Sequence, residues 1–119
     1  MFALGLSMLV GLEALYIMIL EMFMSAEKQA AVFGIDKKVL NIKEVRSLLA
    51  NQGIYNGALG ALILVVGIFF MANAGKIFLS LLMVYIVIVA LYGALTVNKK
   101  IALVQGLPAL VALLALIFS

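Results

Sequence analysis

The run Asn51-Gln52-Gly53-Ile54-Tyr55-Asn56-Gly57 opens a long apolar segment of the chain. No other part of the 119 residues holds amides and glycines so densely. The apolar residues that follow are those of a helix that crosses a membrane. The run therefore predicts that a membrane helix begins here with polar side chains still on it.

The composition places the whole chain, residues 1–119, in a single membrane domain. It is 68% hydrophobic and 11% charged, with a mean hydropathy of +1.35, whereas soluble domains are about 25% charged. Small soluble domains bury the smallest fraction of their surface and could not hide this much apolar area. The net charge of +3 is too small and scattered for a nucleic-acid-binding protein, so we expect no nucleic-acid partner.

The chain has no Cys and no His. Thiolate nucleophiles, histidine metal sites and histidine general bases are therefore excluded, and we expect no metal, no cofactor and no catalytic residue. Carboxylates, lysines and tyrosines remain as groups that could exchange protons.

The apolar segments predict an all-α, polytopic membrane protein. A bilayer core of about 30 Å needs about 20 helical residues, and we expect spans at about 2–24, 48–72, 77–97 and 101–118, with a basic loop at 25–47. Short turns between the later spans favour an up-down bundle of four transmembrane helices. Glu13 within the first segment, and no basic residue before it, favour a retained span over a signal peptide. Within the loop, Val39–Leu49 predicts a short surface helix.

Basic residues predict the orientation. Seven of them lie in the loops after the first and third spans, and only Lys76 lies on the opposite side: Lys28, Lys37, Lys38, Lys43, Arg46, Lys99 and Lys100. Cytoplasmic loops carry the excess of Lys and Arg. We therefore expect both loops in the cytoplasm and both termini outside a bacterial plasma membrane.

Polar residues within the spans predict a site in the bundle interior. Most should lie in the cytoplasmic half, whereas Glu13 lies about 12 Å further along the first span, near the middle of the membrane. Gln52 and Asn56 are four residues apart, so they share a helix face and should form the inward pair. The residues expected to bind a ligand or couple protons are Glu13, Glu21, Gln52, Asn56, Tyr92, Thr96 and Gln105.

A structural role is the alternative for many of these residues. Polar residues in membrane bundles commonly join helices by hydrogen bonds, which suits the amides. Small residues favour close helix packing and a proline can kink a span, which we expect of Gly53, Gly57, Gly60 and Pro108.

The glutamates are the strongest functional candidates. An acidic residue at a helix centre costs about 2.5–3.5 kcal/mol on insertion and usually marks a pathway or a paired site. No Lys or Arg lies deep in a span to pair with Glu13. Glu21 has the alternative of reaching the interface near Lys28 or Arg46.

Four motifs together resemble those of a family of small bacterial four-span membrane proteins catalogued as a domain of unknown function. They are Glu21-Met22-Phe23, Asn51–Gly57, Tyr92-Gly93-Ala94-Leu95-Thr96 and Gln105-Gly106-Leu107-Pro108-Ala109. The family tends to carry Trp after the first motif, where this chain has Met24-Ser25 and no Trp. The resemblance implies the four-span fold, a bacterial plasma membrane and a shared polar cluster, but no activity.

Three functions follow from these observations. The first is a membrane protein that binds or transports a small solute, cation or lipid-like molecule; a homodimer is one arrangement that would provide a through-path. The second is a structural or partner-binding subunit whose polar cluster fixes helix register and whose basic loop contacts a partner or anionic membrane lipid. The third, a lipid-modifying enzyme, lacks any nucleophile or metal motif.

Overall fold

The computed structural model describes all 119 residues and contains helices and short connections only. The elements are α1 (Phe2–Phe23), α2 (Ala26–Phe33), α3 (Lys37–Leu40), α4 (Lys43–Phe69), α5 (Gly75–Thr96), the π-helical turn η1 (Ala102–Gly106) and α6 (Leu107–Ile117). The predicted all-α class is confirmed. The number of helices differs, with six α-helices instead of four, because the basic loop itself folds into α2 and α3.

Three helices are long and apolar enough to cross a membrane: α1, α4 and α5. The remaining apolar helical segment, Ala102–Ile117, is shorter. It begins as η1 and continues as α6. These lengths and compositions are those of a membrane helix bundle.

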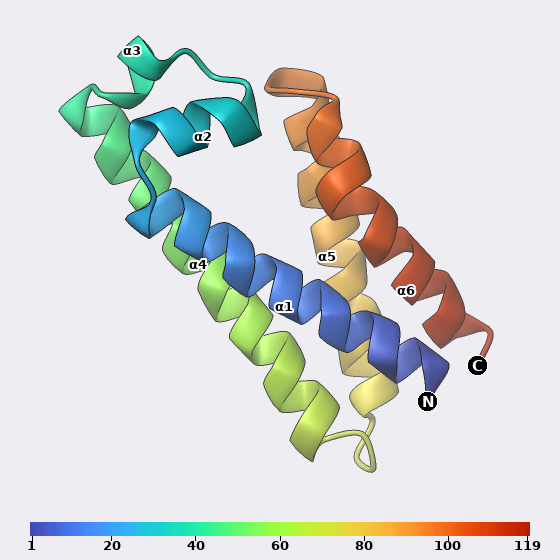
Figure 1. Cartoon of the computed structure of the whole chain (residues 1–119). Coiled ribbons are helices and arrows are strands. Elements are labelled where there is room, and N and C mark those ends of the chain that lie inside the picture. The colour runs from blue at the N-terminus through green and yellow to red at the C-terminus, as the bar shows by residue number, and fades with distance from the viewer.

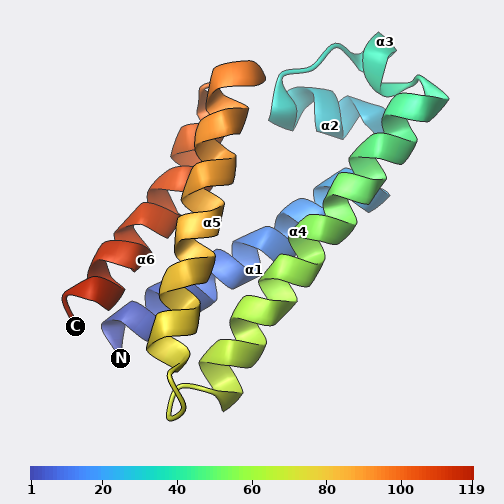
Figure 2. The same ribbon diagram turned by 180° about the vertical axis from the view of Figure 1, so that it is seen from behind.

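The four long helical segments form two antiparallel hairpins, α1 with α4 and α5 with η1–α6 (Figure 1). Both views show the hairpins close together near the chain termini and spread apart toward α2 and α3 (Figures 1 and 2). Contacts between hairpins come mainly from α1 against α6 and, to a lesser extent, from α4 against α5. The spread leaves α4 and α5 apart over much of their length.

Glycines on α4 allow the close packing of the first hairpin. Gly53, Gly57 and Gly60 are buried against α1. A Cβ at Gly57 would overlap the Met18 side chain, and one at Gly60 would lie 2.6 Å from the backbone oxygen of Gly11. The backbones of α1 and α4 therefore approach most closely where Gly60 faces Gly11.

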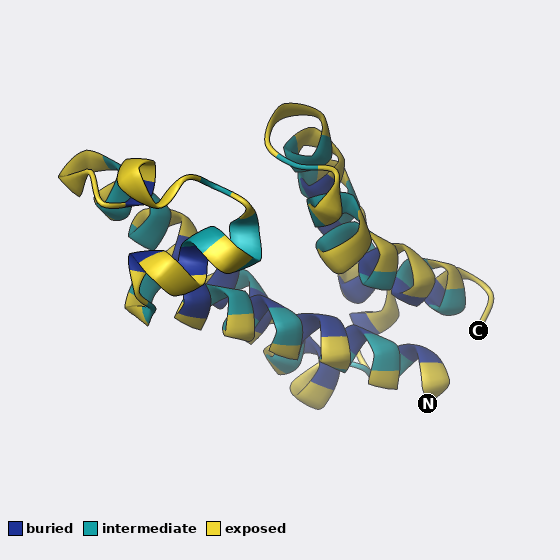
Figure 3. Cartoon of the chain, turned by 45° about the horizontal axis from the view of Figure 1, so that its top comes forward, coloured by how far each residue is buried: buried dark blue, intermediate teal, exposed yellow.

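The buried core joins the two hairpins at the end that carries the termini. It combines residues of α1, α4, α5 and α6, among them Val10, Ile63, Leu79, Met83, Ala109 and Leu116. Buried residues lie in patches along the helices, between turns that are exposed or intermediate (Figure 3). The exposed faces of the long helices are rich in Leu, Ile, Val and Phe, as in helices that contact lipid.

The basic loop has a defined structure. Ser25 caps α2 by accepting a hydrogen bond from the Lys28 backbone N–H, and Gly34 ends it with a φ of +70°. Gly34 suits this left-handed conformation because it lacks a Cβ. The predicted surface helix over Val39–Leu49 is wrong: α3 ends at Leu40, residues 41–42 form a connection, and α4 begins at Lys43.

The π-helical turn lies immediately before Pro108. The Leu107 N–H donates to the carbonyl of Ala102, five residues back, and Pro108 occupies the first turn of α6. A proline ring clashes with the carbonyl four residues before it and removes one backbone donor. The wider π turn accommodates this loss, and Gln105 lies within it.

Candidate functional site

The polar residues predicted to converge do not share one cavity. Glu21 pairs with Asn56 between α1 and α4. Glu13 and Gln105 line a second location between the hairpins. Gln52, Tyr92 and Thr96 lie on exposed surfaces. The expectation of a single polar layer is therefore wrong, and the polar residues divide into three groups.

The Glu21–Asn56 pair is buried in the half of the first hairpin that lies toward α2. The Asn56 Nδ2 donates a hydrogen bond of 2.6 Å to Glu21 Oε1. Both side chains are 7% exposed. The neighbouring Gly53 and Gly57 let α1 come close enough for this short side-chain bond. The pair links the two helices directly.

Gln29 and Arg46 close the end of α1, a role that no sequence pattern indicated for either residue. Gln29 is 1% exposed, and its Nε2 donates to the carbonyls of Leu20 and Glu21 at 2.9 and 3.2 Å. The last carbonyls of a helix have no partner within the helix, and Gln29 satisfies two of them.

Arg46 holds Gln29 in place. Its guanidinium donates to Gln29 Oε1 at 3.3 Å and to the carbonyls of Leu40 and Met24 at 3.3 and 3.2 Å. A cation near a helix C-terminus also complements the helix dipole. The alternative that Glu21 reaches toward Lys28 or Arg46 is not what the structure shows, since Glu21 pairs with Asn56. A lone Gln in a basic loop carries no sequence signal for such capping.

Glu13 and Gln105 line one narrow cavity at the point where the four long helical segments meet. Its other lining residues are apolar and come from α1, α4 and α5: Val10, Ala14, Ile17, Leu59 and Ile86. Both polar side chains are partly buried, and neither makes a side-chain hydrogen bond or ion pair. The space is too tight for a free water molecule. A carboxyl and an amide therefore line the same cavity, and neither has a hydrogen-bond partner in the protein.

Three predicted site residues point away from the helix interfaces. Gln52 is exposed, so the prediction that it forms an inward pair with Asn56 is wrong for Gln52. Tyr92 is 68% exposed, and the Thr96 hydroxyl donates to the Tyr92 carbonyl of its own helix. Each of these residues lies close to the edge of a buried helix face, and helical periodicity alone did not show on which side of that edge its side chain falls.

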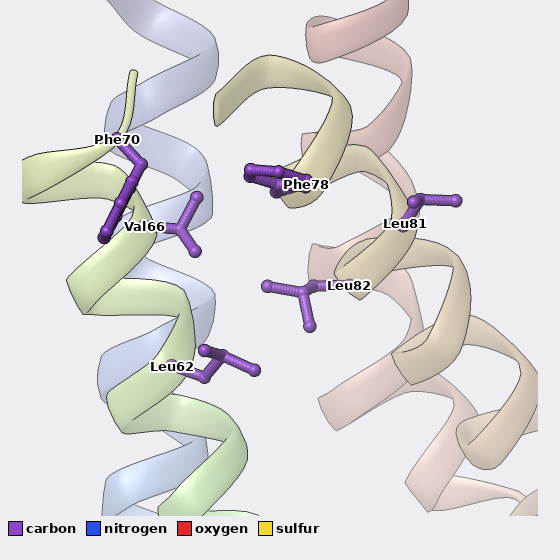
Figure 4. A pocket seen from close by; sticks show the side chains of 6 residues that line it. All are labelled: Leu62, Val66, Phe70, Phe78, Leu81 and Leu82. Atoms are coloured by element: carbon purple, nitrogen blue, oxygen red, sulfur yellow. The ribbon is translucent and has the colours of Figure 1, made fainter. Parts of the chain in front are cut away.

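A second, larger cavity lies between α4 and α5, toward the turn that connects them. It measures about 420 Å³ and is lined only by apolar residues: Leu62, Val66, Phe70, Phe78, Leu81 and Leu82. Leu62 and Val66 of α4 face Phe78 and Leu82 of α5 across the space (Figure 4). We refer to these six residues as the α4–α5 groove.

The fold and these sites define a helical protein with helices of the membrane-spanning type. The chain belongs to the family described as "Protein of unknown function (DUF1304)", whose model matches residues 8–117. It is also similar to the "Uncharacterized protein YpaA" of Lactococcus lactis subsp. lactis (strain IL1403). The two are 48% identical over 114 residues, which cover 95% of this chain and 94% of the relative. No solved structure matches the chain.

Proposed function

We propose that this protein is a four-span integral membrane protein of the bacterial plasma membrane that binds a small solute, cation or lipid-like molecule at Glu13 and Gln105. The shorter helical segment Ala102–Ile117 would form the fourth span. Both termini would lie outside, because the basic loops gather at the other end of the bundle. A reporter that is active only outside the cytoplasm, fused after Ser119, tests the orientation.

The observation that carries the proposal is that Glu13 and Gln105 line the same cavity and neither has a hydrogen-bond partner in the protein. Acidic groups inside a membrane are costly and usually pair with another group. Glu21 has such a partner in Asn56, whereas Glu13 has none. A bound molecule would supply the missing hydrogen-bond donor or positive charge.

The position of the cavity suits binding that is coupled to movement. Glu13 lies on the first hairpin and Gln105 on the second. Because the cavity has no room for free water, a ligand would have to part the hairpins slightly. Binding would then change how the two hairpins pack, which is what a transporter or a membrane sensor requires.

Nuclear magnetic resonance on protein in lipid nanodiscs tests this function. Butylammonium and dodecylammonium serve as probes, and the side-chain amide signal of Gln105 reports their arrival. Either probe should shift that signal in the wild type and in Glu44→Gln, which removes an exposed carboxylate on α4. Glu13→Gln should weaken the response at least tenfold. An unchanged response in Glu13→Gln for both probes would contradict the proposed site.

A structural subunit is the second candidate, and the Glu21–Asn56 bond favours it. That bond joins two helices, and both of its side chains are buried. Under this alternative the polar residues set helix register, and changes at Glu13 would alter stability without altering the binding of any probe.

A further inference from the structure

We propose that the ligand of the Glu13 site is a single-chain amphiphile, with a cationic amine head at Glu13 and Gln105 and an alkyl tail in the α4–α5 groove. This inference rests on the proposed function and adds the chemical class of its ligand. It follows from the position of the two cavities along one seam of the structure.

The polar cavity and the α4–α5 groove are consecutive along two helices. On α4, Leu59 lines the polar cavity and Leu62, one turn on, lines the groove. On α5, Ile86 lines the polar cavity and Leu82, one turn before, lines the groove. Because the helices are antiparallel, both steps run in the same direction, away from Glu13 and toward the α4–α5 turn.

The groove has the form and surface of a site for an alkyl chain. From Leu62 to Phe70 it extends about 12 Å along α4, at 1.5 Å per residue. All six lining residues are hydrophobic, and the space between them is about 420 Å³ (Figure 4). A polar molecule would gain no hydrogen bond there, whereas methylene groups would gain dispersion contacts on two sides.

The head of the ligand is specified by the groups at Glu13. A carboxylate in a low-dielectric region is stabilised most by a nearby cation. The chain supplies none, since its one ion pair joins Lys37 to the exposed Glu27 outside the spans. An ammonium group carries donors for both the Glu13 carboxylate and the Gln105 amide oxygen. A neutral head or a phosphate would supply no positive charge to stabilise the ionised form of the Glu13 carboxyl.

The test measures how tightly matched probes bind, from the change in the Gln105 side-chain NMR signal. Each dissociation constant is expressed as a mole ratio of probe to lipid. Butylammonium reports the head alone, dodecylammonium the head and tail, and dodecanol the tail alone. Leu62→Trp fills the groove. Ile54→Trp places the same side chain on an exposed surface of α4 outside the groove, and it is the control for changes in folding or lipid contact.

We expect Leu62→Trp to weaken dodecylammonium binding about tenfold, which corresponds to about 1.4 kcal/mol of lost contacts. Butylammonium binding should remain unchanged in Leu62→Trp, and Ile54→Trp should bind both probes as the wild type does. Dodecanol should not shift the Gln105 signal.

Two results would overturn the inference while leaving the proposed function intact. One is binding that depends on Glu13 but is equal for both ammonium probes in wild type and Leu62→Trp. The other is dodecanol binding as tight as that of dodecylammonium, which would indicate a neutral head. Loss of any dependence on Glu13 would instead overturn the proposed function itself.

Discussion

The Asn56 amide donates a 2.6 Å hydrogen bond to the Glu21 carboxyl, and this bond lies between two helices that glycines hold in close contact. The two residues are 35 positions apart in sequence and both are buried. The bond joins α1 directly to α4. It also gives one membrane glutamate a structural partner, which distinguishes Glu21 from Glu13.

Replacing Asn56 by Ala should lower the free energy of unfolding by about 1–3 kcal/mol, because the Glu21 carboxyl would be left buried without a partner. Thermal unfolding in detergent measures the change. Gln52→Ala, on the same helix but exposed, should change stability by less than about 0.5 kcal/mol.

A double-mutant cycle isolates the bond itself. Asn56→Ala combined with Glu21→Ala, which removes both the donor and the acceptor, should show a coupling of about 0.6 kcal/mol or more, the average for membrane hydrogen bonds. Additive effects of the two substitutions would show that the bond contributes nothing to stability.

Glycine substitutions on α4 should differ in a defined order. Gly60→Ala should lower the free energy of unfolding by about 1–3 kcal/mol, the usual cost of an overpacked site, because its Cβ would meet the Gly11 backbone. Gly57→Ala should cost less, because the Met18 side chain that its Cβ would meet can move. Gly5→Ala is the control, since no atom lies within 4 Å of its Cβ. Equal thermal stability of the Gly60 and Gly5 variants would contradict the close helix crossing.

Arg46→Ala should loosen the end of α1. The substitution removes bonds to Gln29, Leu40 and Met24 and should cost about 1–3 kcal/mol. Hydrogen exchange should accelerate at the backbone amides of α2 and at the α1–α2 connection. Lys43→Ala, an exposed cation one turn earlier on α4, should leave exchange there unchanged.

The Lys37–Glu27 ion pair predicts a local pH dependence outside the spans. The hydrogen bond from Lys37, with its positive charge, lowers the pKa of Glu27. A lowered folded-state pKa means that the pair contributes stability above the unfolded pKa and loses it as pH falls through the folded pKa. Carboxyl-carbon NMR should show Glu27 titrating below its ordinary range in the wild type and within it in Lys37→Met. Identical titrations would exclude the pair in solution.

The sequence predicted the helical class because apolar segment length and composition depend on few details. It did not predict α2 and α3, because a segment with many charges gives little hydrophobic periodicity. The caps that define these helices, Ser25, Gly34 and Asp36, are recognisable only after the helix ends are known. The long α4 begins earlier than expected because its first turns carry charges that hydropathy excludes.

The sequence indicates where a polar residue lies along its helix, but not which way its side chain points. Glu21 and Asn56 were expected near one end of the bundle, and they meet there. Gln52 points outward although it lies four residues from Asn56, because an α-helix of 3.6 residues per turn rotates the two side chains apart by about 40°. The neighbourhood of Gln105 depends on the π turn before Pro108, which changes the helix phase. Regular periodicity cannot anticipate such a shift.

The most direct test of the Glu13 site is a distance measurement by solid-state NMR in lipid bilayers. Dodecylammonium labelled with ¹⁵N would be added to protein with ¹³C-labelled glutamate carboxyls. We expect ¹³C–¹⁵N dephasing at the Glu13 carboxyl, at the separation of an ion pair, with none at Glu21 and loss of the signal in Glu13→Gln. Dephasing at Glu21 instead, or at no membrane carboxyl, would contradict the Glu13 site.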